Sequence, residues 1–240
     1  GQSWDTPEDW VKTNCLGKLN LIRELNKIKN IKYVRISTPE VYGANTNKIK
    51  EDDKIFPSTP YAITQSTADF FTFAYTKFKG FNSITLRFAN FYGPGQQLFR
   101  IIPKTIISIL QRKKLSIHGD GSSLRSFIFP TDFSESILLA IKKGKKNEVY
   151  NISPPTEISI INLVKLICKI MKYNDKKLIV FTKDRVGKDL RYMMDSKKAN
   201  KDLGWRNKIT LKKGLKTTID WHIQNFKKLN KLNSTYIHKK

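Results

Sequence analysis

The chain has 240 residues, of which 39% are hydrophobic and 27% are charged. That balance is enough for a packed core and excludes a disordered, collagen-like, coiled-coil or disulfide-scaffold chain. The formal net charge is +25, from nine arginines and 36 lysines against 20 acidic residues. The lysines are spread from end to end, which is typical of a solvated surface. A basic surface that binds a polyanion is the alternative.

Cysteine, histidine and hydropathy patterns narrow the class of protein further. Cys15 and Cys168 lie far apart and form no C-x-x-C pair, which favours a reducing compartment and predicts a cytoplasmic protein. The three histidines lack metal-ligand spacing, so we expect no metal site. No apolar run approaches the roughly 20 residues of a membrane span. No nucleic-acid motif is visible, so neither a membrane nor a nucleic acid is the expected partner.

The first part of the chain alternates between helical and strand-like patterns. A helix is expected to begin near Thr6, a candidate N-cap followed by proline, and apolar residues continue at helical spacing to Leu25. A short apolar strand covers 33–37. A second helix, with a hydroxyl N-cap and a proline start, covers 58–79, and a second strand covers 83–88.

The rest of the chain keeps this alternation in shorter, less regular elements. The expected strands are 115–118, 126–129, 150–153 and 178–181. The expected helices are 101–112, 131–142, 160–171, 196–203 and 211–229. Short strands that alternate with helices predict an α/β fold with a mainly parallel sheet.

The first candidate site follows the strand at 33–37. Ser37, Thr38 and Glu40 stand at the carboxyl end of this strand, where ligands of open parallel sheets bind. A hydroxyl and a carboxylate in this place can serve as hydrogen-bond donor and general base. An ordinary polar junction between strand and loop is the alternative interpretation.

A second candidate lies at the start of the next helix. Tyr61 and Gln65 are four residues apart and therefore share a helix face. A tyrosine can transfer protons if a nearby cation or a specific hydrogen bond lowers its pKa from about 10. Gln65 offers a hydrogen bond but no charge. On spacing alone, packing is the more common role of such a tyrosine.

The remaining candidates are polar residues beside glycines. The strand at 83–88 ends at Phe88 and runs through Asn90 into a Gly-Pro-Gly turn. Arg125 follows the turn Gly119-Asp120-Gly121, and Arg185 lies two residues before a glycine. Glycine allows close backbone approach, and arginine holds phosphate through paired hydrogen bonds. A surface position is the alternative for each arginine.

Together these motifs resemble the extended short-chain dehydrogenase/reductase family, in its NAD-dependent epimerase/dehydratase branch, and look most like the dTDP-glucose 4,6-dehydratases. The resemblance covers nearly the whole chain. Its motifs, in chain order, are STPEVYG, PSTPYAITQS, LRFANFYGPGQQ, HGDGSSLRSF, DRVGKD and LGW.

The resemblance implies a Rossmann-like domain, a nucleotide-diphosphate sugar as substrate and tightly held NAD, with NADP not excluded. It implies catalytic roles for three residues: Tyr61 takes the C4 hydroxyl proton, Thr38 hydrogen-bonds the same oxygen and Glu40 takes the C5 proton. It further implies cofactor binding by Ser37, Tyr61, Gln65, Phe88 and Asn90, and substrate binding by Asn90, Arg125 and Arg185.

Three departures from the family pattern are visible. The glycine-rich fingerprint that holds the NAD pyrophosphate is absent, so we expect a fragment that lacks the first half of the sheet. Gln65 stands where the family has a lysine that binds the nicotinamide ribose and lowers the tyrosine pKa. Pro39 stands where the dTDP-glucose enzymes have aspartate.

The expected organisation has two parts. Residues 1–94 form the second half of the NAD-binding domain, to which 126–150 return, and 95–240 form mainly a smaller substrate-binding lobe. The predicted function is a nucleotide-sugar 4,6-dehydratase, a lyase that is a homodimer when full length. The alternatives are a 4-epimerase or decarboxylase of the same family, a binding-only relative without turnover, and a nucleic-acid binder.

Overall fold

The computed structural model describes residues 2–184, 187 and 189–238. Its main sheet has three parallel strands in the order β1-β2-β7, with bounds Tyr33–Ser37, Ser83–Phe88 and Val149–Ile152. The register pairs Ser37 with Arg87, so the carboxyl ends of β1 and β2 lie side by side. All six residues of β2 are buried, as expected of a central strand covered on both faces.

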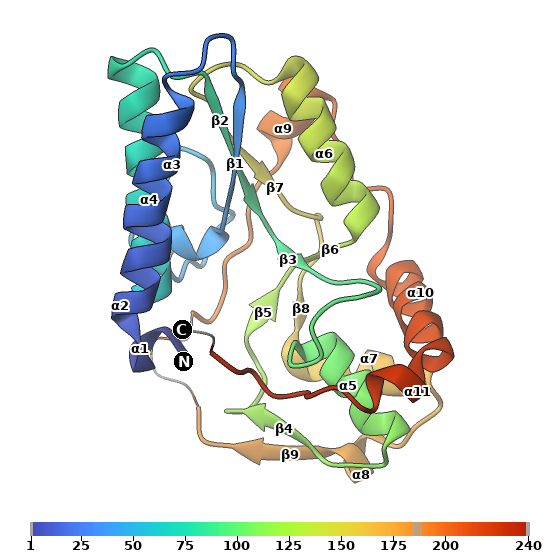
Figure 1. Cartoon of the computed structure of the whole chain (residues 1–240). Helices are drawn as coiled ribbons and strands as arrows, with labels where there is room; N and C mark the ends of the chain where they lie inside the picture. The colour runs from blue at the N-terminus through green and yellow to red at the C-terminus, as the bar shows by residue number, and fades with distance from the viewer. Residues whose placement is uncertain (1, 185–186, 188, 239–240) are drawn as a thin grey trace.

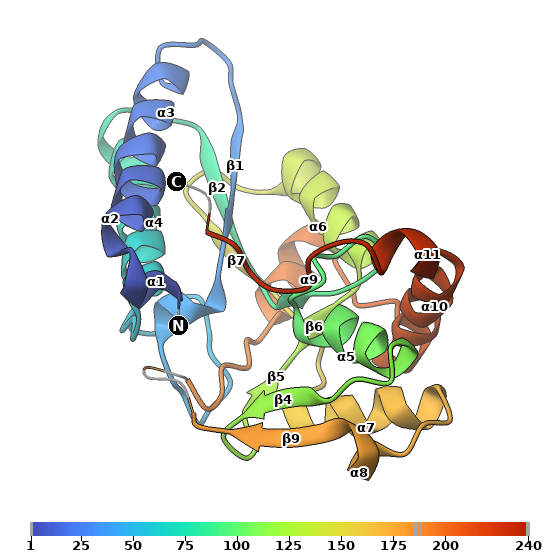
Figure 2. The same cartoon turned by 60° about the horizontal axis from the view of Figure 1, so that its bottom comes forward.

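Helices cover both faces of this sheet (Figures 1 and 2). One face carries α4 (Pro60–Phe78) together with the chain's first helix. The other face carries α6 (Pro130–Lys143) and α9 (Lys197–Leu203). This layered arrangement is the expected α/β fold with a Rossmann-like parallel sheet, and the strands expected at 33–37 and 83–88 are confirmed.

The first helix and α4 differ in how they begin. Thr59 caps α4 by accepting a hydrogen bond from the amide of Ala62 at 3.2 Å, and Pro60 takes the first position, as expected. Thr6 occupies the N-cap position of its helix but makes no capping bond; its hydroxyl instead lies 3.3 Å from Nε2 of His238. The N-cap position expected at Thr6 is therefore confirmed, but its side chain does not make the capping hydrogen bond.

The first helix is a succession of differently wound segments. It follows a short α1 and changes to π-helical winding in η1 before returning to α-helix. The bounds are Gln2–Asp5 for α1, Pro7–Trp10 for α2, Val11–Gly17 for η1 and Lys18–Leu25 for α3.

The second region is built from two-stranded pairs and helices (Figure 2). β3 pairs with β6 and β4 with β9 in parallel, whereas β5 and β8 are antiparallel. The strand bounds are Asn90–Phe91, Leu115–His118, Leu124–Arg125, Phe127–Ile128, Ile158–Ser159 and Ile179–Thr182 for β3, β4, β5, β6, β8 and β9. The helix bounds are Ile101–Leu110, Ile160–Ile170, Asp175–Leu178, Leu211–Gln224 and Phe226–Leu229 for α5, α7, α8, α10 and α11.

The apolar side chains form two large buried clusters. The first lies around the main sheet and includes Ile84, Leu86 and Ile152, together with Leu203 and Trp205 from the later chain. The second lies between α5, α7 and α10 and the short strands of the second region. The segment 192–205 thus packs onto the main sheet, and α9 contacts β7.

Three further observations concern the described residues as a whole. None of their helices has the length and apolar character needed to pass through a bilayer. Within the same residues, no group of three histidine, cysteine or acidic side chains is arranged to hold a metal ion. Both cysteines are free thiols.

Candidate active site

The candidate site lies at the carboxyl edge of β1 and β2. Directly after β1, Thr38 caps the short 3-10 helix η2 (Pro39–Tyr42) by accepting a hydrogen bond from the Glu40 amide at 3.3 Å. This turn fixes the position of Glu40 just beyond the strand end. Gly43 ends the turn in the left-handed region at φ 68°, where an added Cβ would collide with the carbonyl oxygen of Phe56.

Glu40 is a carboxyl group with a perturbed pKa. Burial raises the pKa of Glu40 most, and the negative charge of Asp189 raises it further, while Arg125 and Arg100 oppose the increase. A carboxylate whose pKa is raised toward neutrality accepts a proton more readily, as a general base requires.

Tyr61 comes from the first turn of α4 and lies beside the other two candidates. Burial and the charge of Glu40 raise the pKa of Tyr61 to about 12, whereas Arg100, a hydrogen bond with Thr38 and the charge of Arg35 lower it. Its ring packs edge-on against Trp10, with centroids 5.2 Å apart. The structure therefore brings the three expected catalytic residues, Thr38, Glu40 and Tyr61, together, with the phenol protonated at neutral pH.

Gln65 lies one turn further along α4 and contacts a buried cation. Its side-chain Oε1 accepts a hydrogen bond from Nη2 of Arg35 at 2.8 Å, and its backbone carbonyl accepts another from the same atom at 3.0 Å. Arg35 lies in the middle of β1 and is 2% exposed. Its Nε lies 2.5 Å from Oδ1 of Asp69, and Nη2 of Arg87 lies 3.1 Å from the other carboxylate oxygen.

The other expected cofactor-binding residues line the same edge. Ser37 is buried and donates its hydroxyl to Oδ2 of Asp69 at 3.0 Å, so its side chain belongs to the arginine–aspartate cluster. Phe88 is buried against the ring of Phe133, with centroids 4.5 Å apart. Asn90 donates its amide to the backbone carbonyl of Ser126 at 3.4 Å.

The structure describes one of the two arginines that are expected to bind the substrate. Arg125 donates to the backbone carbonyl of Asp189 at 2.7 Å and stacks over the ring of Tyr192 at 4.2 Å, within electrostatic range of Glu40. Arg185 lies outside the described residues.

Several residues at this site were missed by sequence reasoning: Trp10, Arg35, Asp69, Arg100 and Asp189. One signal was available, because a charged residue in the middle of a buried strand, as Arg35 is in YVRIS, needs a buried partner. Asp189 lies in the DRVGKD motif, in which Arg185 is the expected site residue. Ser58 donates to its Oδ1 at 2.8 Å, which orients the carboxylate.

Two buried polar atoms of this site are relevant to whether it can hold the implied NAD. Nε1 of Trp10, whose ring packs on Tyr61, and Oγ of Ser126, beside Asn90, are buried without a hydrogen-bond partner in the described part of the chain. Buried polar atoms without a partner cost free energy, so they offer hydrogen bonds to a ligand. The carboxyl edge thus fits the nicotinamide end of the cofactor, although the 240 residues contain no glycine-rich pyrophosphate turn.

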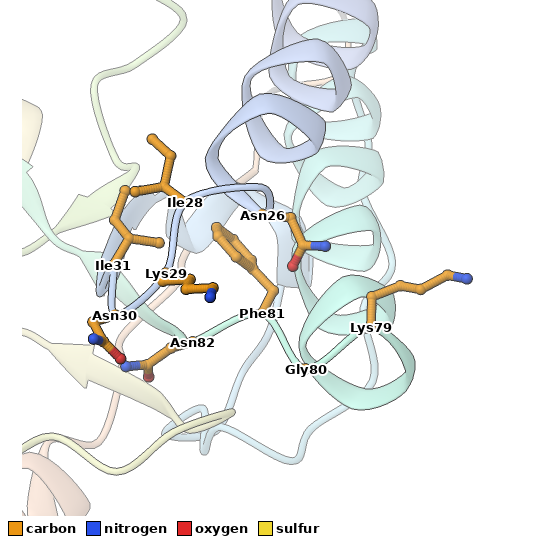
Figure 3. Close-up of a pocket in the computed structure, with 9 residues that line it drawn as sticks. All are labelled: Asn26, Ile28, Lys29, Asn30, Ile31, Lys79, Gly80, Phe81 and Asn82. Atoms are coloured by element: carbon orange, nitrogen blue, oxygen red, sulfur yellow. The ribbon is translucent and has the colours of Figure 1, made fainter.

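A pocket of about 310 Å³ lies at the opposite end of the sheet (Figure 3). It is lined by the loops that precede β1 and β2, including Lys29, Asn30, Lys79 and Asn82. Because it lies at the amino ends of the strands, it is separate from the group of Thr38, Glu40 and Tyr61. Ligands of parallel sheets bind at the carboxyl ends, so we place the candidate site there.

Known proteins resemble this chain in sequence and in fold. The dTDP-D-glucose 4,6-dehydratase of Homo sapiens is 34% identical over 224 residues; the match covers 91% of this chain and 64% of that protein, so the chain spans less than two thirds of its relative. The dTDP-glucose 4,6-dehydratase DesIV from Streptomyces venezuelae, crystallised with NAD, has a TM-score of 0.90 at 27% identity, over 93% of this chain and 70% of that one.

A second solved structure shows that the likeness extends beyond dehydratases. The UDP-glucose 4-epimerase of Thermotoga maritima, solved with UDP-glucose, has a TM-score of 0.88 at 29% identity, over 93% of this chain and 74% of that one. The model of the family described as GDP-mannose 4,6 dehydratase matches residues 1–218. The chain therefore belongs to this family, in the NAD-dependent epimerase/dehydratase branch of the extended short-chain dehydrogenases/reductases.

Proposed function

We propose that the protein is a nucleotide-sugar 4,6-dehydratase, which converts an NDP-hexose to its 4-keto-6-deoxy product and water. The observation that carries the proposal is the position of Glu40, a carboxyl with a raised pKa, beside Thr38 and Tyr61 at the carboxyl edge of the sheet. A hydroxyl pair with no acid would suffice for oxidation alone, whereas elimination of water also needs a base for a carbon-bound proton.

Tyr61 and Thr38 act on the oxygen at C4 of the sugar. Tyr61 takes the C4 hydroxyl proton as a phenolate, after its phenol has lost its own proton, and Thr38, which hydrogen-bonds Tyr61, orients the same oxygen. When bound, NAD (or NADP) would accept a hydride from C4 and return it to C6, so the cycle is redox-neutral. Ser37, Tyr61, Gln65, Phe88 and Asn90 are the residues of this chain that would hold its nicotinamide end.

Glu40 acts on C5. The keto group formed at C4 acidifies the C5 proton, which Glu40 removes, and the C6 hydroxyl accepts a proton from the solvent and leaves as water. The raised pKa of Glu40 supports this role, because a stronger base removes a carbon-bound proton more readily. Asn90, Arg125 and Arg185 would bind the substrate's diphosphate; Arg125 supports this through its position near Glu40.

A second candidate function is 4-epimerisation, which the likeness to the UDP-glucose 4-epimerase favours. An epimerase has no need of a base at C5, so the presence of Glu40 favours dehydration. Decarboxylation requires a site for a C6 carboxylate, and a binding-only protein would show saturable nucleotide binding without turnover.

The test replaces Glu40 by glutamine in the protein produced from its whole coding sequence. Glu40→Gln keeps the shape but cannot accept the proton, so a dehydratase loses formation of the dehydrated product by a factor of about 10² or more. Glu148→Gln is the matched control; this residue is partly exposed and pairs with Lys198, so turnover stays unchanged. Intact turnover in Glu40→Gln, with a 4-epimer as product, would refute the dehydratase proposal.

We also propose how the chain is organised and assembled. Residues 1–94 with 126–150 are the NAD-binding part, and 95–240 are mainly the substrate lobe.

Homodimerisation is supported by Ile63, Phe70 and Phe73, which are 51%, 56% and 47% exposed and share one face of α4 by their spacing. The two free thiols support a reducing compartment, the cytoplasm.

A further inference from the structure

Gln65, four residues after Tyr61, is a neutral side chain that accepts a hydrogen bond from the guanidinium of Arg35. Gln65 has no charge of its own, yet Nη2 of Arg35 donates to both its side-chain and backbone oxygens, at 2.8 and 3.0 Å. The guanidinium therefore lies directly against the turn of α4 that follows Tyr61. It approaches from β1, and the first turns of α4 hold no cation of their own.

The cluster around Arg35 has more positive than negative charge. Arg35 and Arg87 share the single carboxylate of Asp69, so these three groups together carry one net positive charge. All three side chains are nearly inaccessible to solvent, at 1%, 4% and 5% exposure. A buried charge in excess is costly unless neighbouring groups stabilise it.

The charged surroundings of Tyr61 show where this charge acts. From η2, Glu40 raises the pKa of Tyr61, and from the segment before α5, Arg100 lowers it. From β1, Arg35 lowers it as well, although less than Arg100 does. Asp189 and Arg125 lie around Glu40, and the Asp9–His238 pair lies beyond the Trp10 ring. Arg35 is thus the cation that reaches Tyr61 from beneath the helix.

We propose that Arg35, held on Gln65 and Asp69, is a positioning residue that supplies the positive charge for deprotonating Tyr61. This inference depends on the proposed oxidation at C4, which dehydratase, epimerase and decarboxylase share, and not on the elimination step. Arg35 touches neither the substrate nor the reacting atoms. It acts through Gln65 and through the field at the phenol.

The proposal predicts a shift in a pH profile. The rising limb of kcat/KM follows deprotonation of Tyr61. Removing the cation in Arg35→Met makes the phenolate less stable, so the limb moves about one pH unit to higher pH. In the double variant Arg35→Met/Gln65→Lys, a cation on α4 itself restores the limb to the wild-type pH or below it.

Arg87→Met is the matched control. It removes the other guanidinium from the same Asp69, so it lowers the melting temperature as Arg35→Met does, but it leaves the limb in place. If Arg35→Met and Arg87→Met move the limb equally, or if Gln65→Lys does not restore it in the Arg35→Met protein, then Arg35 is a structural residue only and the proposal is overturned.

A second readout requires no turnover. The protein is labelled with ¹³Cζ-tyrosine, and the NMR resonance of Tyr61 is identified by its loss in Tyr61→Phe. This resonance is then titrated in the Glu40→Gln protein, because loss of the neighbouring charge lowers the Tyr61 pKa there. Adding Arg35→Met must raise that pKa; an equal or lower value contradicts the inference. If no NDP-hexose is turned over by the wild type, the proposed function fails, and this titration still tests Arg35.

Discussion

At the scale of single residues, Gly43 holds the turn that carries Glu40. Its φ of 68° and the approach of the Phe56 carbonyl leave no room for a side chain. Gly43→Ala should lower the free energy of unfolding by about 3 kcal/mol. Gly80→Ala is the control: its φ is 73° but the described residues leave space at that position, so the cost is only about 1 kcal/mol. Urea denaturation measures both; equal costs would show that the Phe56 contact is unimportant.

Glu40 also links stability to pH. Because burial and Asp189 raise its pKa in the folded state, the folded protein binds this proton more tightly than the unfolded chain does. That contribution to stability is present below the unfolded pKa of about 4.3 and is lost as the pH rises through the folded value. Glu40→Gln should therefore melt at a higher temperature than the wild type at pH 7, with the difference disappearing near pH 4. A lower melting temperature at pH 7 would contradict the raised pKa.

At the scale of elements, Asp69 joins α4 to β1 and β2. Its two oxygens accept from Arg35 and Arg87, so Asp69→Asn leaves two buried guanidinium groups without their counter-ion and should cost about 3 kcal/mol of stability. As a control, Glu24→Gln breaks an exposed pair with Lys27 and should leave the denaturation midpoint almost unchanged. Similar midpoints for the two variants would mean that the cluster does not hold the helix to the sheet.

Local signals predicted some elements and missed others. The Thr59-Pro60 start located α4, and apolar runs located β1 and β2. The prediction of a single helix over 211–229 is wrong. The helix is interrupted at Asn225, which separates α10 from α11. The short strands β5 and β8 were not expected, because two residues give no periodic pattern.

The same limit applies to the candidate site. Thr38, Glu40 and Tyr61 were expected at one site because each stands beside a strand end or a helix start and because the family resemblance assigns them catalytic roles. The contact of Arg35 with Gln65 joins residues 30 positions apart, and the approach of Asp189 to Glu40 spans an even longer separation. Such pairs depend on tertiary packing, which a single sequence does not reveal.

At the scale of the whole molecule, the main sheet is open at β1. Within the described residues, β1 pairs with β2 on one side and with no strand on the other, and the sequence has no glycine-rich pyrophosphate turn. A polypeptide of these 240 residues should therefore bind NAD only weakly, with a Kd of about 1 mM or higher, and tend to associate through the open edge. Calorimetry that gives a micromolar Kd would contradict this expectation.

The most direct test of the central claim follows the product in D₂O. The protein from its whole coding sequence, with NAD and dTDP-glucose or UDP-glucose, should form a sugar nucleotide that has lost one water. NMR should show a 4-keto group, a C6 methyl and deuterium at C5, because the base at Glu40 exchanges its proton with solvent before protonating C5. A product that is the 4-epimer, with its water retained and no deuterium at C5, would contradict the account.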